Sequence, residues 1–408
     1  MKADMARDPK IALVTHTQVG GVNTMTRFLF RVLSESGRYC PEIITLATSS
    51  ADEASVLFRA PQTWFSGPRV QSFPPGNARR YHVGAYWPEF EFQRQQPRMV
   101  LDNLLAQYDL IQFVVGAPYW ARAAQRIARP TLLWTATTVW ADRASRMLEA
   151  PPLARIWQRA MTHIQQGAEK RALNQVDHVF ALSQYTANTI RPWVPHAKID
   201  VAICGVDTAL FRPAPQPAGT YAICVGRLSD RRKNLQLLLT AYAKAMAGPA
   251  AIPELYLVGD LPAGIERQVA ALGITGRVRF LGERHGEALA DLYRNAQFFV
   301  LSSDEEGLGI VILEAMASGL PVISTNCGGP ATAVVDGETG FLTPVGDADS
   351  LAHAIQRLAE HAELRRHMGD AGRKVVERQF SLAAAGQIFL DKYDKLVWNT
   401  IPSPEPIQ

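Results

Sequence analysis

The stretch that decides the fold is Ser302-Ser303-Asp304-Glu305-Glu306-Gly307-Leu308-Gly309, because a strand-like run precedes it and a helix-like run follows it. The apolar residues 298–301 predict a buried strand, and residues 310–318 predict a helix that ends at Gly319. The glycines at this corner let backbone N–H groups approach a ligand closely, and a helix N-terminus adds partial positive charge. The corner therefore suits a phosphate or a sugar hydroxyl.

Two carboxylates accompany this corner. Glu306 lies within it, and Glu314 lies inside the predicted helix, so the pair could address two parts of one elongated ligand. Acidic residues near a helix start are also favoured by the helix dipole alone. Neither glutamate by itself distinguishes a ligand site from an ordinary strand–turn–helix.

Strand-like runs alternate with helical patterns along the whole chain, which predicts parallel sheets covered by helices. Two such sets occur, and the proline-rich residues 208–220 between them predict a linker. At 408 residues, two doubly wound α/β domains are expected. The predicted strands are residues 10–14, 42–46, 109–115, 131–134, 177–182 and 198–203 in the first set, and 221–225, 254–258, 278–281, 298–301 and 321–324 in the second.

A basic turn follows the strand at residues 221–225. Arg227 leaves the end of the strand and Lys233 stands just before the next helix, so both cations could face a ligand at the edge of the sheet. A diphosphate leaving group needs such positive charge. A basic turn is also often only a solvated surface, and Arg231 and Arg232 are interpreted as solvent-exposed.

Near the N-terminus, a similar corner carries Gly20-Gly21 after the strand and before a helix. A glycine pair without the full G-x-G-x-x-G pattern is weak evidence for a dinucleotide site. His16 in this loop is interpreted as a histidine with satisfied hydrogen bonds.

The composition is that of a globular protein, with 47% apolar and 20% charged residues. The polar N-terminus predicts no signal peptide. No apolar run approaches the roughly 18 residues that a membrane span requires. The four scattered cysteines are interpreted as reduced thiols. A cytoplasmic location is expected, with a peripheral membrane contact left open.

The two halves of the chain differ in charge. Residues 1–205 carry 23 Lys+Arg and 15 Asp+Glu, whereas residues 206–408 carry 19 Lys+Arg and 23 Asp+Glu. Seven of the eight tryptophans lie in the first half. This asymmetry indicates either an anionic partner for the first half or ordinary surface variation.

Taken together, these motifs resemble the retaining glycosyltransferases of family 4. The resemblance rests on E-x7-E with EGLG and EAMASGLPVI around it, on Gly226-Arg227-Leu228 followed by Lys233, and on Gly20-Gly21. Further matches are Ile203 to Asp207 with Phe211-Arg212-Pro213, Val278 to Gly282, and the glycine turns at residues 327–329 and 336–340.

The resemblance implies two facing Rossmann-like domains with an interdomain cleft, the GT-B architecture. The expected domains are residues 1–206 on the acceptor side, residues 207–378 for the donor, and a helix in residues 379–408 that crosses back to the first domain. The implied activity is retaining transfer of a hexose from a nucleoside-diphosphate sugar, UDP being favoured, to a hydroxyl of a glycan, lipid-linked or small-molecule acceptor. No cofactor, no metal and no nucleic acid are expected, and the base, sugar, acceptor, linkage and oligomeric state stay open.

The resemblance also implies roles for individual residues. Arg227 and Lys233 would neutralise the departing diphosphate, with Gly21, Gly307, Leu308 and Gly309 beside it. Glu306 would contact the transferred sugar, and Glu314 would accept hydrogen bonds from the ribose hydroxyls. The residues expected to carry catalysis are thus Glu306, Arg227 and Lys233.

One departure from the family pattern concerns a histidine that commonly follows a first-domain strand. The matching residues 132–138 hold hydroxyl side chains instead, so Thr135 or Thr137 becomes the candidate sugar contact. A nucleotide-sugar epimerase of the same architecture and a non-catalytic sugar-binding subunit remain alternatives.

Two further features have ordinary interpretations beside functional ones. The pair Asp347 and Asp349 matches a short metal-binding motif, but Asp349 is expected to cap the following helix. The residues from Trp64 to Arg98 interleave aromatics with arginines, including Arg79 and Arg80. These side chains could bind an acceptor or could anchor a long loop in the core.

Overall fold

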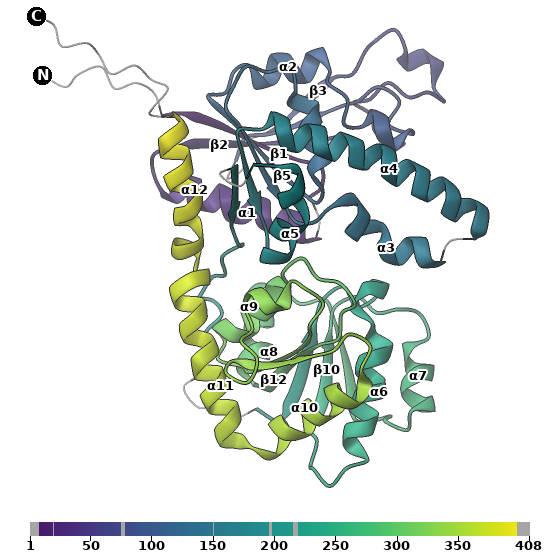
Figure 1. Cartoon of the computed structure of the whole chain (residues 1–408), viewed down its shortest axis with the longest axis vertical. Coiled ribbons are helices and arrows are strands. Elements are labelled where there is room, and N and C mark those ends of the chain that lie inside the picture. Colours follow the sequence, from purple (N-terminus) through teal and green to yellow (C-terminus); the bar gives the residue numbers. More distant parts are fainter. Residues whose placement is uncertain are drawn as a thin grey trace, which may run out of the picture. The chain divides into compact units, whose positions relative to one another are not determined.

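The computed structural model describes residues 8–18, 20–74, 78–149, 151–195, 198–214 and 219–397, and its described part forms two compact units. Unit 1 contains the residues up to Cys204 together with those from Gly386 onward, and unit 2 contains Gly205–Ala385. Figure 1 shows the strands of each unit side by side, with helices packed against them. The extreme N-terminus, part of the predicted linker (residues 215–218) and residues 398–408 lie outside the described residues.

Unit 1 is built on an eight-stranded sheet in the order β3-β4-β2-β1-β5-β6-β7-β8. All neighbouring strands are parallel except β3 and β4, which are antiparallel. The central strands are largely apolar and almost entirely buried, as expected of a parallel sheet covered on both faces. The elements of unit 1 are β1 (Lys10–Thr15), α1 (Gly20–Glu35), β2 (Cys40–Leu46), β3 (Val70–Phe73), β4 (Arg80–Val83), α2 (Met99–Leu105), β5 (Leu110–Val115), β6 (Thr131–Thr135), α3 (Val139–Glu149), α4 (Pro152–Gln175), β7 (His178–Ala181), α5 (Gln184–Ile190) and β8 (Ile199–Val201).

Unit 2 has a six-stranded parallel sheet in the order β11-β10-β9-β12-β13-β14. One continuous apolar core fills the space between this sheet and helices such as α6 and α10. The elements are β9 (Tyr221–Val225), α6 (Leu235–Met246), β10 (Glu254–Val258), α7 (Ile265–Ala271), β11 (Val278–Gly282), α8 (Gly286–Arg294), β12 (Ala296–Leu301), α9 (Ile310–Ala317), β13 (Val322–Thr325), β14 (Gly340–Thr343), α10 (Ala348–Glu360) and α11 (Ala362–Val375).

The last helix, α12 (Leu382–Val397), follows a π-helical turn at Val376–Phe380. It begins in unit 2, and from Gly386 onward it belongs to unit 1. There Phe389 packs against Trp134 and Phe180, with ring centroids 4.6 and 4.5 Å apart. Tyr393 donates a hydrogen bond of 2.8 Å to Gln112 on β5, so buried apolar and polar contacts both hold the helix to unit 1.

Substituting Tyr393 with phenylalanine is expected to lower the free energy of unfolding by about 1–2 kcal/mol, because the buried Gln112 oxygen then loses its donor. Chemical denaturation measures this change. Asp391→Asn, on the exposed side of the same helix, is the matched control and should leave stability nearly unchanged. Equal stability of the Tyr393→Phe variant and the wild type would show that this hydrogen bond contributes nothing.

All eleven predicted strands are present, and their ends differ from the predictions by at most two residues. The prediction missed β3, β4 and β14. The edge strand β3 and its neighbour β4 lack an apolar face, since most of their side chains are exposed or half-buried. A second correction concerns α10, whose N-cap is Asp347 and not Asp349, because the Asp347 carboxylate accepts from the backbone N–H groups of Asp349 and Ser350.

Candidate functional site

The carboxyl ends of β9 and β12 define the candidate site of unit 2. From β9 the chain proceeds outward to β10 and β11, then crosses to the other side of β9 to form β12. Ligands of open α/β sheets bind beyond the carboxyl ends of the strands at such a switch point. The loop after β9 carries Arg227 and Lys233, and the loop after β12 carries Glu306, so the fold brings these three predicted residues to one edge.

Lys233 and Glu306 form an ion pair between the two loops, with Lys233 Nζ bonded to Glu306 Oε1. Their side chains are only 13% and 11% exposed, and Ser303 donates a hydrogen bond of 2.8 Å to the same carboxylate oxygen. A Cβ on Gly226 would lie 3.6 Å from Lys233 Cε and 3.9 Å from Nζ, so the lysine lies against the glycine backbone. The sequence predicted both residues but not their contact, since 73 positions separate them.

Hydrogen bonds from side chains that were not predicted from the sequence connect these two loops. Asn234 adopts a left-handed conformation with φ of 45°, caps α6 and donates a 2.8 Å hydrogen bond to Asp304. The hydroxyl of Ser302 donates to the backbone carbonyl of Lys233 at 2.9 Å. An asparagine before an apolar helix is a recognisable cap, and this signal could have identified Asn234.

The glycine corner after β12 adopts the geometry that its sequence predicts. Gly309 has φ of 79°, and α9 starts at the next residue. A Cβ on Gly329 would lie 2.4 Å from the carbonyl oxygen of Glu306, so a second glycine loop closes against the corner. Leu308 is 1% exposed. Its side chain therefore belongs to the core, and only its backbone can serve a ligand.

Glu314 lies on the second turn of α9 in a half-buried position. Tyr293 of α8 donates a hydrogen bond of 3.0 Å to its Oε2 atom. Desolvation raises the pKa of Glu314 to about 7, although the Tyr293 hydrogen bond opposes this shift. Within the described part of the chain Oε1 accepts no hydrogen bond from protein, which leaves one oxygen for a ligand. Tyr293 was not predicted, and no local pattern marks it.

Arg227 remains 60% exposed and lies 3.6 Å from Asp230. Its charge can therefore reach an incoming anion with little rearrangement. Arg231 is exposed, as predicted, whereas the prediction was wrong for Arg232. The Arg232 guanidinium is partly buried and bonds the Asp230 carboxylate at 2.8 Å, so it shapes the turn.

The predicted residues of unit 1 lie at the carboxyl ends of β1 and β6. Gly20 has φ of 68°, and a Cβ on Gly21 would meet no atom within 4 Å, so the start of α1 is open to a ligand. Thr137 is half-buried. Thr135 is fully buried, and its hydroxyl contacts the carbonyl oxygens of Gly116 and Thr137 at 3.1 and 3.0 Å. We therefore correct its assignment from a sugar contact to a residue that closes the turn.

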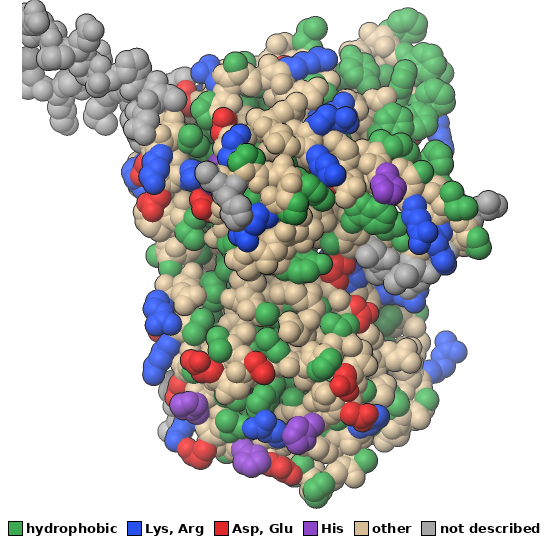
Figure 2. Space-filling model, in the orientation of Figure 1, with side chains coloured by type: hydrophobic (Ala, Val, Ile, Leu, Met, Phe, Trp, Pro, Cys, Tyr) green, Lys and Arg blue, Asp and Glu red, His purple; other side chains and the backbone are tan. Residues whose placement is uncertain are grey.

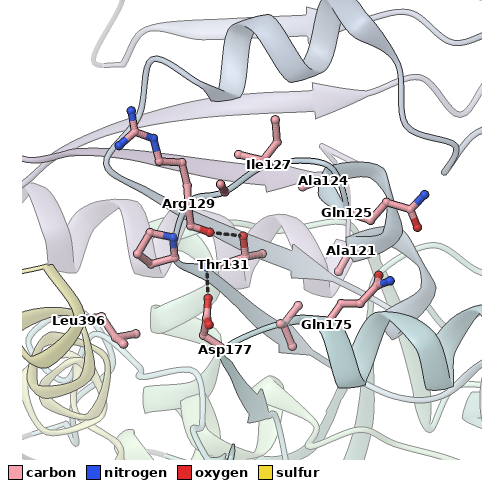
Figure 3. A pocket seen from close by; sticks show the side chains of 12 residues that line it. Ala121, Ala124, Gln125, Ile127, Arg129, Thr131, Gln175, Asp177 and Leu396 are labelled. Carbon is pink, nitrogen blue, oxygen red and sulfur yellow. Dashed lines mark hydrogen bonds between the residues drawn. The ribbon is translucent and has the colours of Figure 1, made fainter. Parts of the chain in front are cut away.

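A cavity of about 430 Å³ lies at the opposite edge of this sheet, where β6 and β7 begin. Figure 3 shows Thr131 between Arg129 and Asp177 on its wall, with both hydrogen bonds drawn. The Asp177 carboxylate accepts from the Thr131 N–H at 2.8 Å, which ties the starts of the two strands. These polar groups thus stabilise the sheet. None of the predicted site residues lines the cavity.

Comparison with known proteins relates the chain to sugar transferases over most of its length. The family model described as Glycosyltransferase Family 4 matches residues 19–210, and the model described as Glycosyl transferases group 1 matches residues 208–375. The two matches adjoin at the predicted linker and together contain every predicted site residue.

Curated relatives share part of this sequence. N-acetyl-alpha-D-glucosaminyl L-malate synthase of Bacillus anthracis is 38% identical over 220 residues, covering 51% of this chain and 57% of that protein. The lipopolysaccharide core biosynthesis glycosyltransferase LpsE of Rhizobium meliloti is 33% identical over 193 residues, covering 46% and 53%. The chain thus spans about half the length of these curated relatives.

Solved structures show the same fold. Sucrose-phosphate synthase from Thermosynechococcus elongatus matches with a TM-score of 0.73 at 23% identity, covering 96% of this chain and all of that one. HepE from Anabaena, solved in complex with UDP, matches with a TM-score of 0.70 at 19% identity, covering 95% and 100%. These matches identify two Rossmann-like sheets of the GT-B type. With the two adjoining family models, they lead to one conclusion: the chain belongs to glycosyltransferase family 4, the glycosyl transferases group 1.

Proposed function

We propose that this protein transfers a hexose from a nucleoside-diphosphate sugar to a hydroxyl group of an acceptor, with retention of the anomeric configuration. The observation that carries the proposal is the Lys233–Glu306 ion pair at the switch point of unit 2, with the exposed Arg227 beside it. Family membership supports the same reaction. UDP is the favoured nucleotide, in keeping with the UDP that the Anabaena HepE structure holds.

In this proposal the two cations stabilise the leaving group. As the bond between the anomeric carbon and the diphosphate breaks, negative charge grows on the diphosphate oxygens, and Lys233 and Arg227 neutralise it. The acceptor hydroxyl attacks from the leaving-group face and gives its proton to the departing diphosphate. A protein nucleophile is then unnecessary. Glu306, held by Lys233 and Ser303, contacts the transferred sugar, and the open oxygen of Glu314 accepts from the ribose hydroxyls.

The acceptor side of the proposal concerns a surface of unit 1 that we call the aromatic surface. Most of the aromatic side chains between β2 and α2 are exposed, Phe65 being 97% and Trp64 47% exposed, whereas Tyr81 is half-buried and packs on the core. Among the arginines, Arg94 is half-buried, and Arg98 is buried and donates to the backbone carbonyl of Arg94 at 3.0 Å. The aromatic surface consists of Phe58, Trp64, Phe65, Trp87, Phe90 and Phe92. Ring contacts around Phe58 and Phe90 link these side chains, except that of Phe65.

Figure 2 shows hydrophobic side chains gathered at the upper right of that view, over the segment between β2 and α2. Clusters of exposed rings of this size mark binding surfaces. Arg59, Arg79 and Arg80 are exposed in the same segment and supply positive charge. No helix among the described residues is long and apolar enough to cross a membrane. We therefore propose that the aromatic surface touches an anionic membrane surface or a lipid-linked acceptor.

A donor panel tests the proposed reaction. Thermal unfolding with UDP-, GDP- and ADP-hexoses should reveal one donor that raises the melting temperature, because a ligand that binds only the folded state stabilises it. Product analysis with that donor should then show free nucleoside diphosphate and a transferred or hydrolysed sugar. Conversion of the donor into its epimer would select the epimerase alternative. Binding without any turnover would select the sugar-binding subunit.

Replacing Trp64 and Phe65 with serine is expected to weaken binding to vesicles that contain anionic lipid by about tenfold, because two exposed rings are lost from the contact. Vesicle sedimentation measures this change. Val345→Ser, which removes an exposed apolar side chain from unit 2, is the matched control. Membrane binding that is unchanged in the Trp64→Ser, Phe65→Ser double variant would exclude the aromatic surface as the contact.

Replacing Arg79 and Arg80 with serine is expected to raise the acceptor KM severalfold and leave the donor KM nearly unchanged. Arg79 is 66% exposed with Glu42 3.8 Å away, so its charge is available to an anion and is screened by salt. Steady-state kinetics at two ionic strengths check both statements. An acceptor KM that is unaffected by the substitution would remove these arginines from the acceptor site.

A further inference from the structure

His16 occupies the switch point of unit 1. The strands β2, β3 and β4, which follow β1 in the chain, all lie on one side of β1 in the sheet. The next strand, β5, pairs with β1 on its other side. His16 directly follows β1, and Gly116 directly follows β5. Ligand sites of open α/β sheets lie at this position. The same edge carries the open Gly21 and the start of the 16-residue helix α1.

Two neighbours fix the imidazole ring. It stacks on Trp120, with ring centroids 4.8 Å apart and planes 15° from parallel, and Trp120 itself is 4% exposed. A Cβ on Gly116 would lie 3.6 Å from His16 Cε1 and 3.7 Å from Nε2. The ring therefore lies over the Gly116 backbone. The Gly116 carbonyl in turn accepts hydrogen bonds from Thr135 and from the Thr137 N–H.

One nitrogen of this stacked ring has no hydrogen-bond partner among the described residues. Nδ1 is buried and has no partner among the residues that the structure describes, which corrects the interpretation of His16 as a satisfied loop histidine. A buried polar atom without a partner is costly, so its presence beside the stacked rings of His16 and Trp120 needs a reason. Burial lowers the pKa of His16 to about 4, although the nearby Asp142 opposes this shift. The ring is thus neutral near pH 7, with one nitrogen that donates and one that accepts.

We propose that the His16 imidazole binds a hydroxyl group of a sugar ring and so selects the carbohydrate substrate of the enzyme. A hydroxyl both donates and accepts, so it suits a neutral imidazole in either tautomer. An anion is a poorer match for this uncharged group. The assignment rests on the proposed function, because it takes the ligand to be the donor hexose or the acceptor.

The test compares His16→Phe with His16→Gln. Phenylalanine keeps an aromatic ring to stack on Trp120 but cannot hydrogen-bond, whereas glutamine keeps a donor and an acceptor. The measurements use the nucleotide sugar that most stabilises the wild type in the donor panel, its parent nucleoside diphosphate, and octyl glucoside as acceptor. We expect His16→Phe to retain the wild-type melting temperature and the wild-type affinity for the nucleoside diphosphate.

His16→Phe is expected to weaken the interaction with the sugar about tenfold, which corresponds to the loss of one hydrogen bond. His16→Gln should recover part of this interaction. If the hydroxyl belongs to the donor hexose, the preference for nucleotide sugar over nucleoside diphosphate falls, and donor hydrolysis without acceptor slows. If it belongs to the acceptor, only the KM for octyl glucoside rises. Wild-type values of all these quantities in a folded His16→Phe protein would overturn the assignment. Failure of every nucleotide sugar to bind the wild type would instead refute the proposed function on which it rests.

Discussion

Replacing Lys233 with alanine is expected to slow sugar transfer by a hundredfold or more. In the proposed mechanism the ammonium group supplies charge where the diphosphate gains negative charge in the transition state, a contribution of roughly 3 kcal/mol. The substitution also leaves the Glu306 carboxylate, 11% exposed, without its cation. An unpaired carboxylate at that position repels the diphosphate, so the loss should exceed that from Arg227→Ala. Single-turnover rates with the preferred donor measure the effect.

Arg231→Ala is the matched control for this prediction. Arg231 belongs to the same short turn, residues 231–233, but its side chain is exposed. It should keep nearly full activity. The double variant Lys233→Ala, Glu306→Gln removes both charges. Its rate relative to the wild type should exceed the product of the relative rates of the two single variants, because the residues act as a pair. A folded Lys233→Ala protein with the wild-type rate would show that other groups neutralise the diphosphate.

Replacing Glu314 with alanine is expected to weaken donor binding by at least about tenfold and to change the rate of the bound complex little. In the proposed mechanism the carboxylate holds the ribose hydroxyls and does not touch the bond that breaks. Glu306→Gln should show the opposite pattern, with a lower catalytic rate and unchanged nucleotide affinity. Calorimetry and single-turnover kinetics separate the two effects. Reversal of this pattern would exchange the two roles.

The pH dependence of donor binding tests the same assignment independently. Because the pKa of Glu314 is raised to about 7, the ionised form that accepts ribose hydrogen bonds predominates only above neutral pH. Donor affinity should therefore rise between pH 6 and pH 8, by about tenfold. A nucleotide sugar is the suitable ligand, since its diphosphate does not titrate in this range. Glu314→Gln should bind the donor with a nearly flat pH profile, and an equally steep profile in that variant would exclude Glu314 as the titrating group.

The sequence sufficed for most of the architecture because the eleven predicted strands are largely apolar runs between recognisable turns, whereas β3, β4 and β14 were missed. The corner at Gly309 was predictable in detail, since a glycine before a helix and an apolar strand before the turn each have a distinct local signal. The position of Arg227, Lys233 and Glu306 at one edge of the sheet was predictable for a similar reason. They follow strands, and the carboxyl ends of parallel strands share one edge.

What the sequence could not provide are contacts between residues distant in the chain. Lys233 lies against Glu306, and Tyr293 donates to Glu314, through packing that no local pattern encodes. Thr135 looked available as a hydroxyl, but burial assigns it to the turn. His16 looked like an ordinary loop residue until its stacking on Trp120 and its unpartnered nitrogen were visible.

The division of α12 between the two units has a consequence for biosynthesis. Residues 386–397 complete unit 1, and their buried side chains Phe389 and Tyr393 pack on strands made hundreds of residues earlier. Unit 2, by contrast, is one continuous stretch that leaves the ribosome before these residues do. The unit that is translated first is therefore the last to be finished. Until α12 emerges, the nascent chain exposes the apolar ring of Trp134 and its neighbours, and a chaperone has its longest opportunity to bind there.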